Sequence, residues 1–293
     1  MRWIKLLLLA GIAAAAIGWF ITAPKVVDAS DFAGLSGDTA RGALVFHASG
    51  CASCHTAPGA DSSDTPELGG GQRFPSPFGT FVSPNISPDP EYGIGTWSTL
   101  DLANAMVKGV SPKGQHYYPA FPYASYARAE PQDIVDLKAF LETLPPVAQA
   151  SAPHEVGFPF NIRRSLGVWK LLFVNDGWVV PVLPGPQERG RYLVEALGHC
   201  SECHTPRNQL GGLQLDNWLG GAPDPSGKGK VPDISPTGLD WSEADIAYYL
   251  ETGFTPEFDS VGGHMTHVVE NMARLPKSDR DAIAAYLKAL PVD

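Results

Sequence analysis

Hydrophobic and polar positions divide the chain into one apolar run at the N-terminus and a body in which short helical stretches alternate with long loops. Near the C-terminus, Ile283, Tyr286, Leu287 and Leu290 recur at helical spacing, which places them on one face of a helix. We expect three helices in each half of the body. In the first half, one helix runs from about Asp38 into a cysteine pair, the second follows Ser98 and the third covers about Pro131–Leu144. In the second half, the corresponding helices begin at about Pro186, follow Ser242 and cover about Ser278–Leu290.

Local signals support several of these helix starts. Each of Ser98, Ser242 and Ser278 is followed three positions later by an aspartate, which predicts a capping box with Asp in place of Glu. No run alternates apolar and polar residues as a half-buried strand does, so we expect an all-α fold. The loops are too long and too rich in the 31 glycines and 27 prolines for helices alone to fill a core. We therefore expect another large apolar object in each domain.

The apolar N-terminal run extends without a charge from Leu6 to Ala23, after Arg2 and Lys5. Its length reaches the lower end of the about 17–25 residues that span a bilayer. A cleaved signal peptide is the alternative, although Pro24 directly after Ala23 should hinder cleavage. We expect an uncleaved anchor in the inner (cytoplasmic) membrane. Both alternatives place the body on the periplasmic side, because the basic residues precede the run.

The body repeats itself. Cys51–His55 (CASCH) recurs as Cys200–His204 (CSECH), and Asn85–Pro88 (NISP) recurs as Asp233–Pro236 (DISP). A Trp-Ser pair follows in both halves, in the same order. A repeat of this kind indicates two homologous domains. We expect an anchor or signal at 1–23, a first domain at 36–145, a linker packed on both domains at 146–185 and a second domain at 186–291.

The repeated Cys-x-x-Cys-His motif is the attachment signature of a c-type haem. Two thiols on one helical turn, Cys51 with Cys54 and Cys200 with Cys203, can form thioethers with the two vinyl groups. The histidine that follows each pair, His55 or His204, then supplies the proximal ligand of the iron. A zinc site would not place His after the second Cys in both copies, and a thioredoxin-like site needs a βαβ context. The sequence therefore predicts two covalent haem c groups.

The sixth iron ligand of the second haem has one leading candidate. Cytochromes that only carry electrons commonly pair His with Met at the iron. Met265 lies in a glycine-rich segment between the middle and last helices, and such a loop can approach an iron closely. We expect Met265 to be this ligand. Met272, His264 and His267 are the alternatives, and Met272 also suits an ordinary core position.

The first domain departs from its twin at this point. Counting from the shared tryptophan, Met265 corresponds to Phe121, which cannot ligate iron. Met106 is the only methionine of this domain and corresponds to Leu250, so it is either a core residue or the ligand. His116 is a further candidate, which could instead bond a haem propionate. An open position that admits a small ligand is the remaining alternative.

Charge changes the picture of possible partners. Lys and Arg number 21 against 31 Asp and Glu, which gives a formal net charge of −10. A basic nucleic-acid-binding surface is therefore not expected. An acidic body favours a redox partner with a basic docking patch and salt-sensitive association rates.

Together these motifs resemble the membrane-bound multihaem cytochrome c subunits of bacterial dehydrogenase complexes, which oxidise alcohols, aldehydes, gluconate or related sugars. The resemblance covers about residues 36–291. Members often carry Met at the position of Phe121 or Ala129, and many have three haems and a C-terminal membrane tail. The segments that carry the resemblance are 51–55, 83–88, 93–98, 116–123, 158–163 and 203–208.

Two functional hypotheses follow. The first is a membrane-tethered dihaem cytochrome that takes electrons from a dehydrogenase large subunit or another donor. It would pass them to quinone, a soluble cytochrome or an oxidase. The second is a dihaem enzyme, such as a peroxidase or a sulfur-compound oxidoreductase, with the first haem as reaction centre. Binding of carbon monoxide or cyanide at one haem would distinguish the second from the first.

Overall fold

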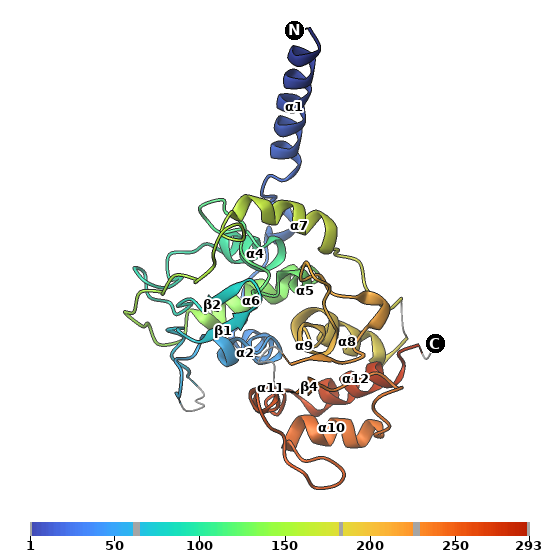
Figure 1. Cartoon of the computed structure of the whole chain (residues 1–293). Coiled ribbons are helices and arrows are strands. Elements are labelled where there is room, and N and C mark those ends of the chain that lie inside the picture. Colours follow the sequence, from blue (N-terminus) through green and yellow to red (C-terminus); the bar gives the residue numbers. More distant parts are fainter. Residues whose placement is uncertain (1, 61–64, 182–183, 225–228, 292–293) are drawn as a thin grey trace.

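A computed structural model describes residues 2–60, 65–181, 184–224 and 229–291, and it separates one N-terminal helix from the body (Figure 1). Helix α1, Arg2–Ile21, projects away from the body, and none of its residues is buried. By length and composition it could cross a membrane. Most of its large apolar side chains are exposed.

Each half of the body contains short helices around a common core. In the first half they are η1 (Ala29–Phe32), α2 (Thr39–Ala48), α3 (Cys51–His55), α4 (Thr99–Lys108), α5 (Tyr123–Tyr126) and α6 (Pro131–Leu141). In the second half they are α8 (Pro186–Tyr192), the π-helical turn η3 (Leu193–Leu197), α9 (Ser201–His204), η4 (Leu215–Asn217), α10 (Glu243–Thr252), α11 (Met265–Met272) and α12 (Lys277–Lys288).

Helix α2 crosses α6 at a glycine, and helix α8 crosses α12 at a glycine in the same way. A Cβ at Gly42 would lie 2.0 Å from the carbonyl oxygen of Asp136, and one at Gly190 would lie 1.9 Å from that of Ala282. Both distances are far shorter than van der Waals contact, so only glycine permits this close approach. The crossings of α2 with α6 and of α8 with α12 are therefore equivalent, and they repeat the architecture as well as the motifs.

Two of the three expected capping boxes are confirmed. Ser98 and Ser242 cap α4 and α10, and in each the N3 aspartate returns a bond to the cap residue. The box expected at Ser278 is wrong, because α12 begins one residue earlier, directly after Pro276. The Pro276 carbonyl accepts the first helical bonds, from the N–H of Asp279 at 3.0 Å and that of Arg280 at 3.4 Å. Ser278 therefore lies inside the helix.

The described residues also form two short hairpins that the sequence pattern does not predict. Strands β1 (Arg73–Ser76) and β2 (Gly79–Val82) pair antiparallel with Arg73 opposite Val82. Strands β3 (Ala222–Pro223) and β4 (Lys230–Val231) form the equivalent pair. Strands of four and two residues are too short to show alternation. The fold is nevertheless mostly helical, as expected.

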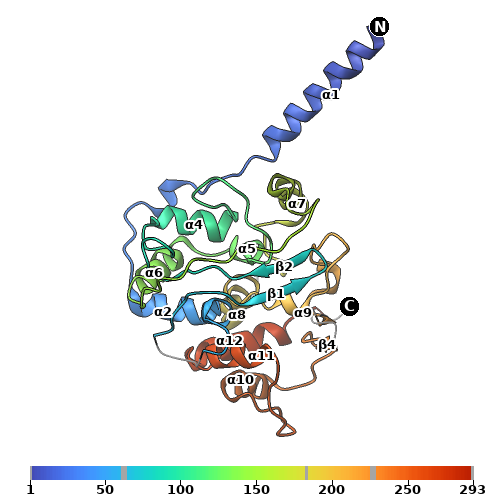
Figure 2. The ribbon, with the colours of Figure 1, turned by 60° about the vertical axis from the view of Figure 1, so that its left-hand side comes forward.

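The linker between the halves contains η2 (Arg163–Ser165) and α7 (Leu166–Phe173) and touches both halves. The Trp169 indole donates to the Leu210 carbonyl at 2.9 Å, and the Lys170 ammonium donates to the Lys108 carbonyl at 2.6 Å. Figure 2 shows α7 beside α4 on the side of the body from which α1 leaves. The linker is therefore a packed part of the body.

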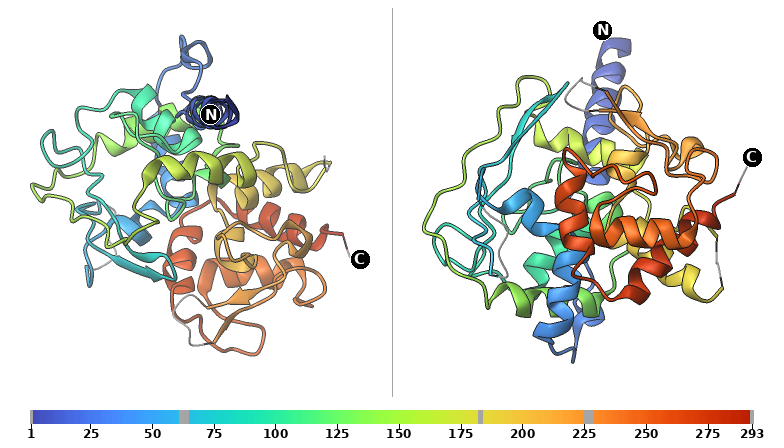
Figure 3. Two further views of the ribbon diagram at one scale, coloured as in Figure 1. Left: turned by 45° about the horizontal axis from the view of Figure 1, so that its top comes forward. Right: turned by 90° about the horizontal axis from the view of Figure 1, so that it is seen from below.

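Buried side chains of the two halves form one continuous core. Phe46 and Ile134 of the first half belong to the same cluster as Leu197 and Tyr286 of the second, and all four are at most 1% exposed. The views in Figure 3 show the helices of the two halves side by side. The relative placement of the two Cys-x-x-Cys-His helices is consequently fixed by packing.

Candidate haem sites

Each motif histidine is held by a proline carbonyl. The Nδ1 atom of His55 lies 2.9 Å from the Pro84 carbonyl oxygen, and that of His204 lies 2.8 Å from the Pro232 carbonyl oxygen. A carbonyl only accepts, so this bond places the proton on Nδ1 and leaves the Nε2 lone pair for a metal. Such a bond also orients the ring and raises its basicity as a ligand.

The loops that supply these carbonyls follow the same path in both halves. The Gly70 N–H donates to the His55 carbonyl at 2.7 Å, and the Gly221 N–H donates to the His204 carbonyl at 2.8 Å. Pro84 and Pro232 directly precede the repeated Asn85–Pro88 and Asp233–Pro236 segments. The repeat therefore serves to position the proximal histidines.

The surroundings of the cysteines suit uncharged sulfur. None of the four is paired in a disulfide. Burial raises the pKa of Cys51 and of Cys200 to about 12. Zinc sites need thiolates, which these surroundings disfavour, whereas a thioether carries no charge. Within the described ranges no three His, Cys, Asp or Glu side chains gather around a common metal position. The donor set thus fits covalent haem.

The segments that directly precede the two cysteine pairs lie against one another. The Ser49 carbonyl, just before Cys51, accepts from the Tyr126 hydroxyl at 3.2 Å and lies 3.2 Å from the His199 Nε2, just before Cys200. The Asn271 amide of α11 donates to the Ser53 hydroxyl of α3 at 3.0 Å. The two attachment sites are therefore neighbours at the centre of the contact between the halves.

The candidate sixth ligands lie in different settings. Met265 is half-buried against the core, as the first residue of α11. The expectation that it lies in a loop is wrong by one residue, because the glycine segment ends at Gly263 (φ +61°) and His264 already has helical φ and ψ. Met106 lies within α4 and is 4% exposed in the core cluster. Met272 is a buried core residue at the end of α11.

Phe121 and His116 occupy distinct places in the first half. The Phe121 ring packs 5.8 Å from that of Tyr126, whose hydroxyl pKa is raised well above its usual value by burial and then by Cys51 and Cys54. Phe121 thus lies on the side of the first cysteine pair. The His116 Nε2 lies 3.0 Å from the Thr22 carbonyl, at the end of α1.

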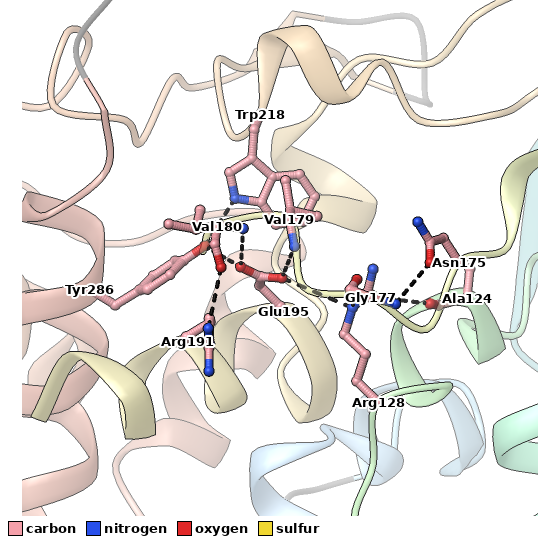
Figure 4. Close-up of polar contacts among 10 residues, drawn as sticks. All are labelled: Ala124, Arg128, Asn175, Gly177, Val179, Val180, Arg191, Glu195, Trp218 and Tyr286. Carbon is pink, nitrogen blue, oxygen red and sulfur yellow. Dashed lines mark hydrogen bonds and ion pairs between the residues drawn. The ribbon is translucent and has the colours of Figure 1, made fainter. Parts of the chain in front are cut away.

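A buried carboxylate that sequence reasoning did not single out fixes the linker (Figure 4). Glu195, 0% exposed, accepts from the Val179 N–H at 2.7 Å, the Val180 N–H at 3.1 Å and the Tyr286 hydroxyl at 2.8 Å. The Arg128 Nε of the first half lies 3.9 Å from Glu195 Oε2. The linker, the second domain and the first domain therefore meet at one side chain.

One signal in the sequence could have located Glu195. The crossing glycine precedes the first motif cysteine by nine positions in one half, Gly42 to Cys51, and by ten in the other, Gly190 to Cys200. The additional residue is accommodated by the π-helical turn that contains Glu195. Turns of this kind are frequent at functional sites.

Comparison with known proteins agrees with this geometry. A family model described as cytochrome c matches residues 39–145 and 187–291. A diheme cytochrome c-type protein of Cereibacter sphaeroides is 55% identical over 289 residues, covering 98% of this chain and 96% of that protein.

Two further relatives are parts of dehydrogenases. A nicotinate dehydrogenase subunit of Pseudomonas putida is 40% identical over 265 residues, 85% of this chain and 21% of that protein. The fructose dehydrogenase cytochrome subunit of Gluconobacter japonicus is 35% identical over 268 residues, 86% of this chain and 52% of that protein. The chain thus spans about a fifth and about half of these two relatives.

Proposed function

The chain belongs to the cytochrome c family and carries two covalently attached haem c groups, and we propose that it is a membrane-tethered electron carrier. In this proposal it accepts electrons from a dehydrogenase and passes them to quinone, a soluble cytochrome or an oxidase. The dehydrogenase donor is supported by the relatives from Pseudomonas putida and Gluconobacter japonicus, which are named as dehydrogenase subunits.

The observation that carries the proposal is the contact between the segments that directly precede the two cysteine pairs. The Ser49 carbonyl of the first half accepts from the Tyr126 hydroxyl of the same half. It also lies 3.2 Å from the His199 Nε2 of the second half, so this contact joins the two halves beside both cysteine pairs. Each bound haem supplies a one-electron couple. Because packing fixes the two attachment sites side by side, an electron that enters one half has a short path to the other. Two separate single-haem functions would not need this contact.

The residues of the chain hold each site in a fixed geometry. His55 and His204 present Nε2 as proximal ligands, with Nδ1 held by Pro84 and Pro232. We assign Met265 as the sixth ligand in the second half, since it begins a helix that packs on the core. His–Met ligation raises the reduction potential and leaves no position for a substrate.

In the first half we assign Met106 as the sixth ligand. It is the only methionine in the sequence of this domain, whereas His116 Nε2 already contacts the Thr22 carbonyl. Fixed ligands on both irons favour electron transfer over catalysis, because neither iron then admits peroxide or a sulfur substrate.

Helix α1 is the proposed tether. Arg2 and Lys5 precede its apolar run, which keeps the N-terminus in the cytoplasm and places the body in the periplasm. Confinement to the membrane surface raises the local concentration of the haems near membrane partners. The acidic body favours a donor or acceptor with a basic docking patch.

Rapid mixing of the reduced full chain with oxidised acceptors tests the proposal. The chain, held in lipid nanodiscs, should be oxidised completely by a quinone or by a soluble cytochrome c. Both haems of the chain should become oxidised. If the soluble cytochrome c carries a basic docking patch, the rate at which it oxidises the chain should fall as the salt concentration rises. Catalytic turnover of hydrogen peroxide, thiosulfate or sulfite, without oxidation by either acceptor, would contradict the proposal.

A further inference from the structure

Helix α7 exposes a continuous apolar arc on the surface of the body. Val168 is 49% exposed, Leu171 is 52% exposed and Leu172 is 63% exposed. At helical spacing these three side chains share one side of α7, while Trp169 and Phe173 turn toward Leu210 and Gly212 of the second half. The opposite side of the same helix packs against the second half. The exposure of the arc is therefore not the result of a loosely packed helix.

The apolar arc adjoins the point where α1 meets the body. A Cβ at Gly167 would lie 2.4 Å from the Thr22 carbonyl oxygen, directly after the end of α1. Leu171 follows Gly167 by one helical turn and so lies on the same side. The left view of Figure 3 looks along α1 and shows α7 crossing the body beside it. A lipid layer that surrounds α1 would thus end at α7.

A cation and an aromatic ring reinforce this junction. The Arg164 guanidinium lies 4.1 Å above the Trp19 ring and also donates to the Trp19 carbonyl. Trp19 is itself 67% exposed. Tryptophan near the end of a spanning helix is typical of the membrane–water interface, and arginine there meets lipid phosphate. A membrane that α1 crosses would therefore bring its headgroups to the start of α7.

The other basic residues of this segment are turned into the protein. The Lys170 ammonium donates to the Gly109 carbonyl at 2.7 Å and lies 4.5 Å above the Tyr123 ring. The Arg163 guanidinium lies 4.4 Å above the Tyr118 ring and donates to the His116 carbonyl at 3.0 Å. The outward side of α7 is consequently left with hydrocarbon alone.

We propose that the outward face of α7, formed by Val168, Leu171 and Leu172, inserts into the outer surface of the lipid bilayer that α1 crosses. This inference rests on the proposed tether. A helix that lies in the interface buries its apolar face about 5–10 Å into the boundary between headgroups and acyl chains. Two contacts, α1 and α7, then fix how the body faces the membrane, which a single helix followed by an extended chain cannot do.

Depth-dependent quenching tests this face in the full chain. Thioether bonds occupy all four native cysteines, so an introduced cysteine is the only free thiol. We would label Leu172→Cys with an environment-sensitive fluorophore and place the haem-loaded chain in nanodiscs with or without lipids that carry a doxyl quencher. The label should lose emission with doxyl groups high on the acyl chain and less with doxyl groups near its end.

Two matched labels make the result decisive. Phe258→Cys, at a site 83% exposed on a loop of the second half, should lose no emission with either quencher. Ile12→Cys, in the middle of α1, should lose most with the deep quencher. If Ile12→Cys is quenched and Leu172→Cys behaves like Phe258→Cys, this inference is overturned and the tether stands. An unquenched Ile12→Cys overturns the tether and the inference with it.

Discussion

The Tyr286 hydroxyl donates to Glu195 Oε1 over 2.8 Å, and this bond joins the last helix of the second half to the π-helical turn before its cysteine pair. Burial, and then Glu195, raises the pKa of the Tyr286 hydroxyl far above its usual value, so this hydroxyl remains a donor. The Trp218 indole donates in turn to the Tyr286 oxygen at 3.2 Å. The Glu195 carboxylate is therefore the final acceptor of a chain of hydrogen bonds that runs from Trp218 through Tyr286.

Replacing Glu195 with alanine should lower the free energy of unfolding by about 3–5 kcal/mol, because buried donors and Arg128 lose their common acceptor. Denaturant unfolding followed by haem absorbance measures the loss. Glu188→Ala is the matched control, since Glu188 is 65% exposed and pairs with Arg191 only at 3.8 Å. The control should cost less than about 1 kcal/mol. Equal losses in both variants would show that the carboxylate has no special role.

Met265→Ala should abolish the Met–iron charge-transfer band of the second haem and lower its midpoint potential, because a Met ligand raises the potential. The first haem should be unchanged. Met272→Ala serves as the control: it removes a buried side chain of the same helix, costs about 2–5 kcal/mol of stability and should leave the band intact. A Met–iron band that keeps its full intensity in Met265→Ala, or a second-haem band that is lost only in Met272→Ala, would assign the ligand elsewhere.

The first haem is tested separately. Met106→Leu keeps nearly the same volume in the core, so the domain should remain folded at a cost below about 1.5 kcal/mol. The variant should lose the Met–iron band of the first haem and bind carbon monoxide in the reduced state. His116→Gln should retain the band. If Met106→Leu keeps the native spectrum and His116→Gln changes it, the histidine is the ligand.

Acid stability should depend on Asp136. Burial alone would raise the pKa of this carboxyl, but hydrogen bonds from Arg41, the Asp38 N–H and Gln132 outweigh it and hold the pKa below 3.8. The stabilisation is complete above the unfolded-state pKa near 3.8 and is lost as pH falls through the lower folded-state value.

The free energy of unfolding, measured from neutral to acidic pH, should therefore differ between Asp136→Asn and the native chain. The variant should lose about 2 kcal/mol at pH 7 and show a weaker decline of stability below the ordinary Asp pKa. A decline as steep as that of the native chain would assign the acid sensitivity to other carboxyls.

What the sequence could predict is mostly local. The caps at Ser98 and Ser242 depend on residues three positions apart, and the haem motifs are contiguous, so both are visible without a structure. The cap expected at Ser278 is wrong because a neighbouring proline carbonyl takes its place. The lack of alternating runs indicated the mostly helical class, and motif repetition indicated the two haems.

The rest depends on contacts between distant segments. The Thr22 carbonyl meets His116, 94 positions away, and the Glu195 site gathers the linker and both domains. The short β1–β2 hairpin is extended by a bridge from Thr80 to Glu155 of the linker. Such pairings leave no periodic pattern, because each depends on one or two residues held by tertiary packing.

The central claim is that this chain holds two haems that carry electrons and do not bind substrate. The most direct measurement is an anaerobic reductive titration of the full chain, followed by optical and electron paramagnetic resonance spectra, with carbon monoxide added at the end. The account predicts two low-spin haems per chain, two one-electron reductions and no shift on adding carbon monoxide. A single haem, or a high-spin haem that binds carbon monoxide, would contradict it.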